Sequence, residues 1–174
     1  MQVLLSNTRL KEVVDSLVKQ LRARHGSFKQ VAFVGIQQGG VAIADELVAA
    51  IRRDDPSAQF EYGQLDITFY RDDIRQNIIA PDRMNLNFGV ENKLVILIDD
   101  VLFTGRTIKA ALDVLLDYGR PEKVELLVLV DRKEHRQFPI QADYVGESFG
   151  TGKMDKIKLV NDERGEKQVV LIPG

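Results

Sequence analysis

Two adjacent aspartates, Asp99 and Asp100, directly follow a run of apolar residues in the stretch "LVILIDDVLFTGRTIKAAL" (94–112). Two ionised carboxylates side by side repel each other, so such a pair needs partners such as sugar hydroxyls, cations or hydrogen-bond donors. Ligands of open α/β sheets bind at the carboxyl ends of the strands. We therefore interpret the acid pair as a set of ligand contacts at the end of a buried strand.

The motif "TGRT" (104–107) follows the acid pair and opens a stretch with a helical pattern. Free backbone N–H groups, the helix dipole, two hydroxyls and a flexible glycine together form a cradle for phosphate. The combination suits a phosphorylated sugar, with its phosphate in the loop and its ribose hydroxyls on the aspartates. The simpler interpretation is an aspartate-rich strand end followed by Thr107 as a helix cap. The order of apolar run, acid pair, "TGRT" and helix favours the ligand site.

Three further polar segments lie at the ends of expected strands. "GIQQGG" (35–40) can bring backbone N–H groups to a diphosphate, although an ordinary strand-to-helix turn explains it equally well. "YRDD" (70–73) opens a polar segment at about 71–93, which we interpret as a lid rather than a solvated surface loop, or as a hairpin around "MNLNF" (84–88). Asp131 and Arg132 end the next strand.

The whole-chain composition is that of an ordinary globular protein: 174 residues, 44% hydrophobic and 29% charged. The formal net charge of -2 provides no bulk attraction to nucleic acid or to an acidic membrane. The absence of cysteine excludes disulfides and thiolate chemistry. No apolar stretch is long enough to span a bilayer and no signal-peptide pattern opens the chain, so we expect a cytoplasmic protein without a membrane partner.

Helical and strand patterns alternate along the chain. Leu10, Val13, Val14, Leu17 and Leu21 recur at helical spacing, and Ser6 or Asn7 is placed to cap that helix. The expected elements are helices at 9–24, 39–53 and 107–118, strands at 30–36, 59–70, 94–98, 124–130 and 142–148, and a hairpin at 156–172.

This alternation predicts an α/β fold: a single domain (1–174) with an open, mainly parallel twisted sheet flanked by helices. The flexible lid loop (about 71–93) and the C-terminal hairpin complete the predicted architecture. No internal repeat or break in composition indicates a second domain.

The segment "VILIDDVLFTGRT" (95–107) closely resembles the phosphoribosyl-diphosphate signature of the type I phosphoribosyltransferases. Four further segments narrow the resemblance to one group within this family: "DITFYRDD" (66–73), "DYGRP" (117–121), "LVDR" (129–132) and "PIQADYVG" (139–146). In that order they are similar to the family of bifunctional pyrimidine-operon attenuation proteins and uracil phosphoribosyltransferases. The resemblance covers nearly the whole chain and fades in the first helix and the last hairpin.

The resemblance implies transfer of ribose 5-phosphate from phosphoribosyl diphosphate to uracil, giving UMP and diphosphate with Mg²⁺. It also implies a fold of the type I phosphoribosyltransferases, and we expect a homo-oligomer, a dimer or higher. The implied catalytic residues are Asp99, Asp100 and Arg71, and the implied metal ligands are Asp72 and Asp73. The implied substrate contacts are Asp99, Asp100, Val101, Leu102, Phe103, Thr104, Gly105, Arg106 and Thr107 for phosphoribosyl diphosphate, Gln37, Gln38, Gly39 and Gly40 for the diphosphate group, and Phe103, Asp131 and Arg132 for the base.

Two positions bear on these roles. The attenuator family usually has a basic residue where Gly39 stands, and glutamines followed by two glycines are more similar to the loop of the purine-salvage enzymes. Those enzymes usually place a proton-handling aspartate where Phe103 stands, so the aromatic residue favours a pyrimidine over a 6-oxopurine. A separate alternative concerns Asp131 and Arg132. An exposed salt bridge between these two residues explains the pair as well as contact with the base does.

An RNA-binding attenuator that senses UMP is the main interpretation from another functional class. The first helix carries Arg9, Lys11, Lys19, Arg22 and Arg24, but also Glu12 and Asp15. Asp15 and Ser16 stand where the regulators of the family tend to have RNA-contacting residues. RNA affinity depends on phosphate contacts by Lys and Arg, so we expect RNA binding to be weak or absent.

Overall fold

The computed structural model describes residues 1–67 and 84–174. The described strands form a six-stranded sheet in the order β4-β3-β2-β5-β6-β7 and a three-stranded sheet in the order β1-β9-β8. The helices are α1 (Asn7–His25), α2 (Gly39–Asp54) and α3 (Arg106–Asp117), and the strands are β1 (Gln2–Leu5), β2 (Val31–Ile36), β3 (Glu61–Leu65), β4 (Met84–Asn85), β5 (Leu94–Leu102), β6 (Lys123–Asp131), β7 (Tyr144–Ser148), β8 (Lys156–Asn161) and β9 (Lys167–Ile172).

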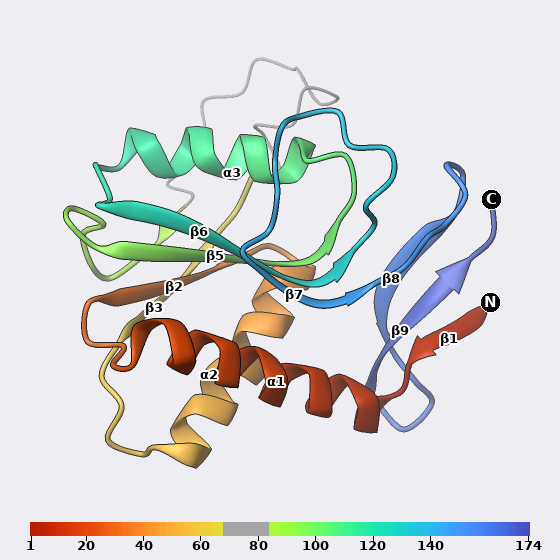
Figure 1. Cartoon of the computed structure of the whole chain (residues 1–174), viewed down its shortest axis with the longest axis horizontal. Helices are drawn as coiled ribbons and strands as arrows, with labels where there is room; N and C mark the ends of the chain where they lie inside the picture. The colour runs from red at the N-terminus through yellow and green to blue at the C-terminus, as the bar shows by residue number, and fades with distance from the viewer. Residues whose placement is uncertain (68–83) are drawn as a thin grey trace.

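The larger sheet is parallel from β3 to β7, and β4 pairs with β3 in the antiparallel sense. Helices α1 and α2 cover one face of this sheet and α3 covers the other (Figure 1). Parallel strands covered on both faces are apolar along their whole length, and every residue of β2 is buried accordingly. The predicted α/β architecture is therefore confirmed.

Helix α1 follows its sequence pattern closely. The Ser6 side chain caps it by accepting a hydrogen bond from the backbone N–H of Arg9 at 3.3 Å. The five apolar positions predicted for its inner face are all buried, and Leu17 is fully buried. The helix ends at His25, and the C-cap residue Gly26 has a φ of 64°, in the left-handed region that glycine adopts readily.

Strand β5 is longer than the sequence predicted. It runs to Leu102 instead of ending at Ile98, so Asp99 and Asp100 lie inside the strand. Pairing with β2 stops at Gly35 and Ile98, but pairing with β6 continues to Leu102. The β6 ladder satisfies the backbone on one side, and the strand therefore continues past its two charged residues.

Other boundaries differ by smaller amounts. The strand predicted at 59–70 is β3, which ends at Leu65, and positions 68–70 lie outside the described residues. Strand β7 begins at Tyr144 instead of Ala142. Helix α3 begins and ends one residue earlier than predicted.

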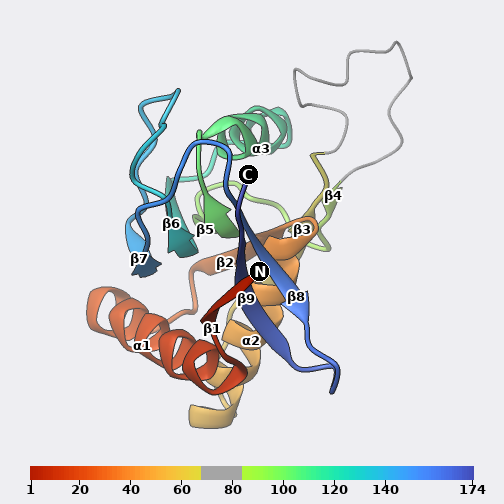
Figure 2. The same cartoon turned by 90° about the vertical axis from the view of Figure 1, so that its right-hand side faces the viewer.

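The predicted C-terminal hairpin is confirmed as the antiparallel pair of β8 and β9. Its turn places Gly165 at a φ of 77°, and the N–H of Gly165 donates to the carbonyl of Asp162 at 3.0 Å. Strand β1, which the sequence did not reveal as a strand, pairs with β9 and completes a separate small sheet (Figure 2). Ile157 and Val169 anchor this sheet in the core beneath α1 and α2.

The described end of the predicted lid packs against the protein. Val90 is 1% exposed, and Leu86 and Phe88 pack on the apolar cluster under α3. In the part of the predicted lid that the structure describes, apolar side chains therefore hold the chain against the rest of the protein. Strand β4 lies within "MNLNF" (84–88), the segment for which a hairpin was the alternative prediction. It pairs with β3 in the antiparallel sense. The remaining lid positions, 71–83, lie outside the described residues.

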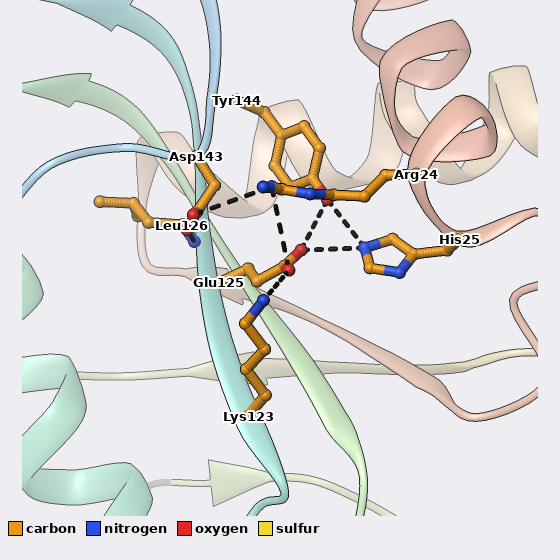
Figure 3. Close-up of polar contacts among 7 residues, drawn as sticks. All are labelled: Arg24, His25, Lys123, Glu125, Leu126, Asp143 and Tyr144. Atoms are coloured by element: carbon orange, nitrogen blue, oxygen red, sulfur yellow. Dashed lines mark hydrogen bonds and ion pairs between the residues drawn. The ribbon is translucent and has the colours of Figure 1, made fainter.

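A buried carboxylate, Glu125, ties α1 to the amino-terminal end of β6 (Figure 3). Its Oε2 accepts a hydrogen bond from Tyr144 Oη at 2.6 Å and lies 2.9 Å from His25 Nε2. Its Oε1 accepts from Lys123 Nζ at 2.8 Å and lies 3.9 Å from Arg24 Nη1. Burial alone would raise the pKa of Glu125, but the hydrogen bonds from Lys123, Tyr144 and His25 lower it to about 2.

Candidate functional site

The start of α2, the carboxyl-terminal part of β5 and the β8–β9 hairpin line an open cavity of about 420 Å³. The small sheet stands beyond the ends of the parallel strands, in front of the start of α2 (Figure 2). The lining therefore joins three segments that are far apart in the sequence. The lining residues are Gln38, Gly39, Ala42, Asp100, Val101, Ile157, Lys158, Leu159, Val160, Asn161 and Lys167.

The acid pair is divided between the two faces of the sheet, because successive side chains of a strand point in opposite directions. Asp100 lies on the α2 face and lines the cavity, and its Oδ1 accepts from the N–H of Val101 at 2.9 Å. Asp99 lies on the α3 face, is 6% exposed, and accepts from the N–H of Asp100 at 2.9 Å. The cavity is thus open to one carboxylate of the pair.

The 37–40 loop approaches β5 so closely that its glycines are needed. A Cβ at Gly40 would lie 2.3 Å from the carbonyl oxygen of Ile98, and a Cβ at Gly39 would lie 2.1 Å from Asp100 Oδ2. The peptide bond between Gln37 and Gln38 is cis. Helix α2 starts here with no side-chain cap hydrogen bond and no acidic residue in its first turn. The first N–H groups of a helix have no partner within the helix, and this helix start borders the cavity through Gln38, Gly39 and Ala42.

The 104–107 loop has the geometry of a phosphate cradle. Gly105 has a φ of 90° and is the N-cap residue of α3, which begins at Arg106. Because glycine has no side chain, this N-cap residue provides no side-chain oxygen to the first N–H groups of the helix. The N–H of Arg106 donates to Thr104 Oγ1 at 3.3 Å. Thr107 is half-buried in the first turn of the helix. A helix start with available N–H groups and nearby hydroxyls is able to bind an anion.

The segment that follows β6 braces this loop. The N–H of Gln137 donates to the carbonyl of Thr104 at 2.8 Å, and Arg106 Nε donates to Gln137 Oε1 at 2.7 Å. A Cβ at Gly105 would lie 3.3 Å from Ile140 Cδ1. The loop conformation therefore depends on residues that lie about thirty positions away in the chain.

The exposed salt bridge considered for Asp131 and Arg132 is contradicted: the two residues are 6% and 3% exposed, and each has another partner. Arg136 Nη2 lies 2.6 Å from Asp131 Oδ1. Arg132 donates from Nε to Thr151 Oγ1 at 2.7 Å, from Nη1 to the carbonyl of Asp155 at 3.0 Å, and from Nη2 to the carbonyl of Gly152 at 2.9 Å. Burial lowers the pKa of the Arg132 guanidinium from its ordinary value.

Phe103 connects these residues to the phosphate cradle. The guanidinium of Arg132 stacks 3.8 Å from the centre of its ring, and His135 meets the ring edge-on at 5.7 Å. Arg136 Nη1 donates to the carbonyl of Phe103. The structure thus brings together the proposed base contacts Phe103, Asp131 and Arg132 at the end of β6. Arg132 holds the 151–155 loop against them through its hydrogen bonds.

The site also contains residues that sequence reasoning missed. Lys158, Asn161 and Lys167 reach the cavity from the C-terminal hairpin, which was predicted as a hairpin without a role. The alternation of polar and apolar residues in β8 was the available signal, but it does not reveal what a strand faces. Lys167 Nζ is bound to Glu46 Oε1 at 2.7 Å.

Three predicted site residues, Arg71, Asp72 and Asp73, lie outside the described residues. Within the described ranges, no group of three or more His, Cys, Asp or Glu side chains converges on a point suitable for a metal ion. In the same ranges, no helix has the length and apolar character needed to cross a membrane.

Comparison with known proteins places this geometry in a family. The family model described as "Phosphoribosyl transferase domain" matches residues 2–170. A "Bifunctional protein PyrR" from Chloroflexus aurantiacus is 38% identical over 174 residues, covering 98% of this chain and 94% of the relative. Another from a Picosynechococcus species is 40% identical over 171 residues, covering 97% of this chain and 96% of the relative.

Solved structures support the same fold. A hypoxanthine phosphoribosyltransferase from Staphylococcus aureus is similar with a TM-score of 0.73 at 24% identity, covering 99% of this chain and 93% of that chain. The hypoxanthine phosphoribosyltransferase of Trypanosoma cruzi has a TM-score of 0.71 at 15% identity, covering 99% of this chain and 97% of that chain. At these identities the likeness shows a shared fold.

Proposed function

Because this chain belongs to the phosphoribosyl transferase domain family, we propose that it is a uracil phosphoribosyltransferase. It would transfer ribose 5-phosphate from phosphoribosyl diphosphate to uracil, giving UMP and diphosphate. The observation that carries the proposal is the position of the "VILIDDVLFTGRT" segment, which forms most of β5 and the start of α3. Asp100 of its acid pair lines a cavity at the strand ends, and its "TGRT" stretch opens helix α3.

The assignment of substrate groups follows the geometry of the strand ends. The N–H groups and hydroxyls of Thr104–Thr107 bind the 5-phosphate, and the 37–40 loop and the start of α2 receive the diphosphate. We assign the ribose hydroxyls to Asp99 and Asp100, because both residues lie in β5, the strand that leads into the 104–107 loop and contacts the 37–40 loop. This arrangement fixes both ends of the substrate on either side of the sugar.

The chemical step exchanges one bond at the C1 carbon of the ribose for another. The bond from C1 to the diphosphate oxygen breaks, the bond from C1 to uracil N1 forms, and the N1 proton is lost. Departure of the diphosphate leaves positive charge on the sugar, and a carboxylate fixed nearby stabilises that charge. Asp100 is the carboxylate that lines the cavity and is placed for this role.

The cofactor proposed for this reaction is Mg²⁺, which neutralises the charge of the departing diphosphate. Mg²⁺ usually binds through one or two carboxylates together with substrate phosphates and waters. The cavity fits this mode, because Asp100 supplies carboxylate oxygens there. Asp72 and Asp73 stay proposed as further metal ligands.

Base choice is proposed to follow from the residues at the end of β6. Phe103 has no proton to exchange with a 6-oxopurine, and its ring forms an apolar surface between Arg132 and His135. Uracil should therefore be used far better than hypoxanthine or guanine, even though purine enzymes share the fold.

The decisive experiment incubates the protein with phosphoribosyl diphosphate, Mg²⁺ and an equimolar mixture of uracil, hypoxanthine and guanine, and identifies the nucleotide by chromatography. We expect UMP to be the dominant product. Preferential formation of a purine nucleotide would overturn the base assignment. Absence of any nucleotide would overturn the transferase assignment.

RNA regulation is a second candidate because the relatives are named as bifunctional, and we propose that it is weak here. Arg9 is paired with Glu12 at 2.9 Å and with Glu147 at 2.5 Å. Arg24 lies within 3.9 Å of Glu125 and 3.8 Å of Asp143. Cations engaged by carboxylates are less available to RNA phosphates, and each lost contact weakens binding and flattens its salt dependence.

A gel-shift titration with a pyrimidine-operon leader hairpin tests this proposal, with UMP present at roughly physiological salt. Sequence-specific regulators typically bind with dissociation constants of about 10⁻⁸ M or tighter. We expect much weaker binding that does not respond to UMP. Tight, UMP-dependent binding would show that regulation is a principal function.

A further inference from the structure

The 37–40 loop has no cation to offer a diphosphate group. Its residues are two glutamines and two glycines, whereas a diphosphate carries several negative charges. The position of Gly39 explains why the loop contains no longer side chain there. A Cβ at this residue would lie 2.1 Å from Asp100 Oδ2 and 2.3 Å from Asp100 Cγ. The carboxylate of Asp100 therefore occupies the volume in which a side chain at Gly39 would begin.

A cation reaches the same cavity from the opposite wall. Strand β8 buries Ile157 in the core at 8% exposure and turns the next residue, Lys158, to its exposed side. Lys158 lines the cavity together with Gln38, Gly39 and Asp100. Two distant segments of the chain thus place Lys158 and the 37–40 loop around one space.

Lys158 is the available cation of this lining. Among the described residues that border the cavity, the cationic side chains are Lys158 and Lys167. Lys167 is bound to Glu46 at 2.7 Å. Lys158 makes no hydrogen bond or ion pair with another residue of the described ranges. Its charge is therefore free to meet a ligand.

The neighbours of Lys158 indicate which part of a substrate it meets. The cavity contains residues of the 37–40 loop and Asp100, which are the proposed diphosphate and ribose contacts. Within the described lining, neither the 104–107 loop nor the Phe103 and Arg132 pair takes part. The side of the site that Lys158 borders is thus the diphosphate side, away from the 5-phosphate and the base.

We propose that Lys158 binds the diphosphate group of phosphoribosyl diphosphate and supplies the positive charge that the 37–40 loop lacks. The proposal rests on the proposed function, because it assigns a residue to the diphosphate end of the same substrate. Lysine is a compact point charge that binds phosphate oxygens without needing a fixed planar geometry. The β8 hairpin then acts as a wall of the active site as well as a structural appendage.

Isothermal titration with inorganic diphosphate and Mg²⁺ tests the proposal without any base or turnover. The variant Lys158→Gln removes the charge, and Lys158→Arg keeps it. Lys156→Gln is the matched control, because Lys156 is exposed on the same strand but does not line the cavity. We expect Lys158→Gln to weaken diphosphate binding by about tenfold or more, and Lys158→Arg and Lys156→Gln to bind nearly as the unaltered protein does.

A parallel titration with ribose 5-phosphate, which has no diphosphate group, separates the diphosphate role from a general one. Its affinity should change by less than about threefold in Lys158→Gln. Equal diphosphate affinity in Lys158→Gln and the unaltered protein would overturn the proposal. A loss of ribose 5-phosphate affinity in Lys158→Gln as large as its loss of diphosphate affinity would also overturn it. The same holds if the unaltered protein does not bind diphosphate. The competition assay with uracil, hypoxanthine and guanine tests the proposed transferase function separately. A failure of the Lys158 proposal is therefore distinguished from a failure of the proposed function.

Discussion

Replacing the buried Glu125 by glutamine should destabilise the fold strongly at neutral pH and less than half as much at pH 3. The Glu125 side chain is fully buried, and its two oxygens are engaged by Lys123, Tyr144 and His25 (Figure 3). Glutamine keeps the size of the side chain but loses the charge, so the substitution isolates the electrostatic contribution. The cluster lies at the amino-terminal end of β6, away from the proposed site.

The magnitude follows from the pKa of Glu125. The folded state lowers this pKa from 4.5 to about 2, and one pKa unit corresponds to about 1.4 kcal/mol, so the ionised carboxylate contributes roughly 3 kcal/mol at pH 7. Because the folded pKa is depressed, this stability is present above the unfolded pKa and is lost as the pH falls through about 4.5 towards about 2. At pH 3 less than half of it, on the order of 1.4 kcal/mol, should remain.

Urea denaturation followed by circular dichroism at pH 7 and at pH 3 measures the prediction. The free energy of unfolding of Glu125→Gln should be lower than that of the unaltered protein by about 3 kcal/mol at pH 7, and the gap should at least halve at pH 3. Glu122→Gln, an exposed neighbour on the same segment, is the control and should change stability by less than about 0.5 kcal/mol. A gap below about 1 kcal/mol at pH 7, or one that is the same at both pH values, would refute the reasoning.

Asp99→Asn combined with Asp100→Asn should abolish nucleotide formation while circular dichroism shows an intact fold; undiminished turnover in a folded double variant would remove the central claim about the site. Gly105→Ala should lower the free energy of unfolding by about 1–2 kcal/mol, because the φ of 90° is strained for a residue with a Cβ, and a melting curve identical to that of the unaltered protein would contradict this. Arg132→Lys should raise the KM for uracil by roughly tenfold, since lysine cannot reproduce the three guanidinium hydrogen bonds that hold the 151–155 loop; an unchanged KM measured by initial rates would show that the loop does not depend on them.

Local patterns in the sequence predicted the elements and much of the site. The apolar run of β5 and the helical spacing of α1 identified those elements, because burial on one or both faces selects residues with a period that can be read along the chain. The "TGRT" stretch was correctly placed at the start of a helix, since glycine and hydroxyl residues mark such starts. The extension of β5 through its acid pair was missed because pairing with β6 is a long-range property.

The tertiary structure decided which residues meet. Nothing in the order of residues places Lys158 and Asp100 in the lining of one cavity, because the alternation within β8 defines two faces but not the partner of either. Glu125 lies within the apolar strand "VELLVLV", and only the packing of α1 and β7 around β6 supplies its histidine and tyrosine partners. The sequence by itself determined the α/β elements and the signature loop, since these depend on short-range periodicity and turn chemistry. The wall of the cavity and the partners of the buried charges were decided by contacts between distant segments, which a single sequence does not encode in any local pattern.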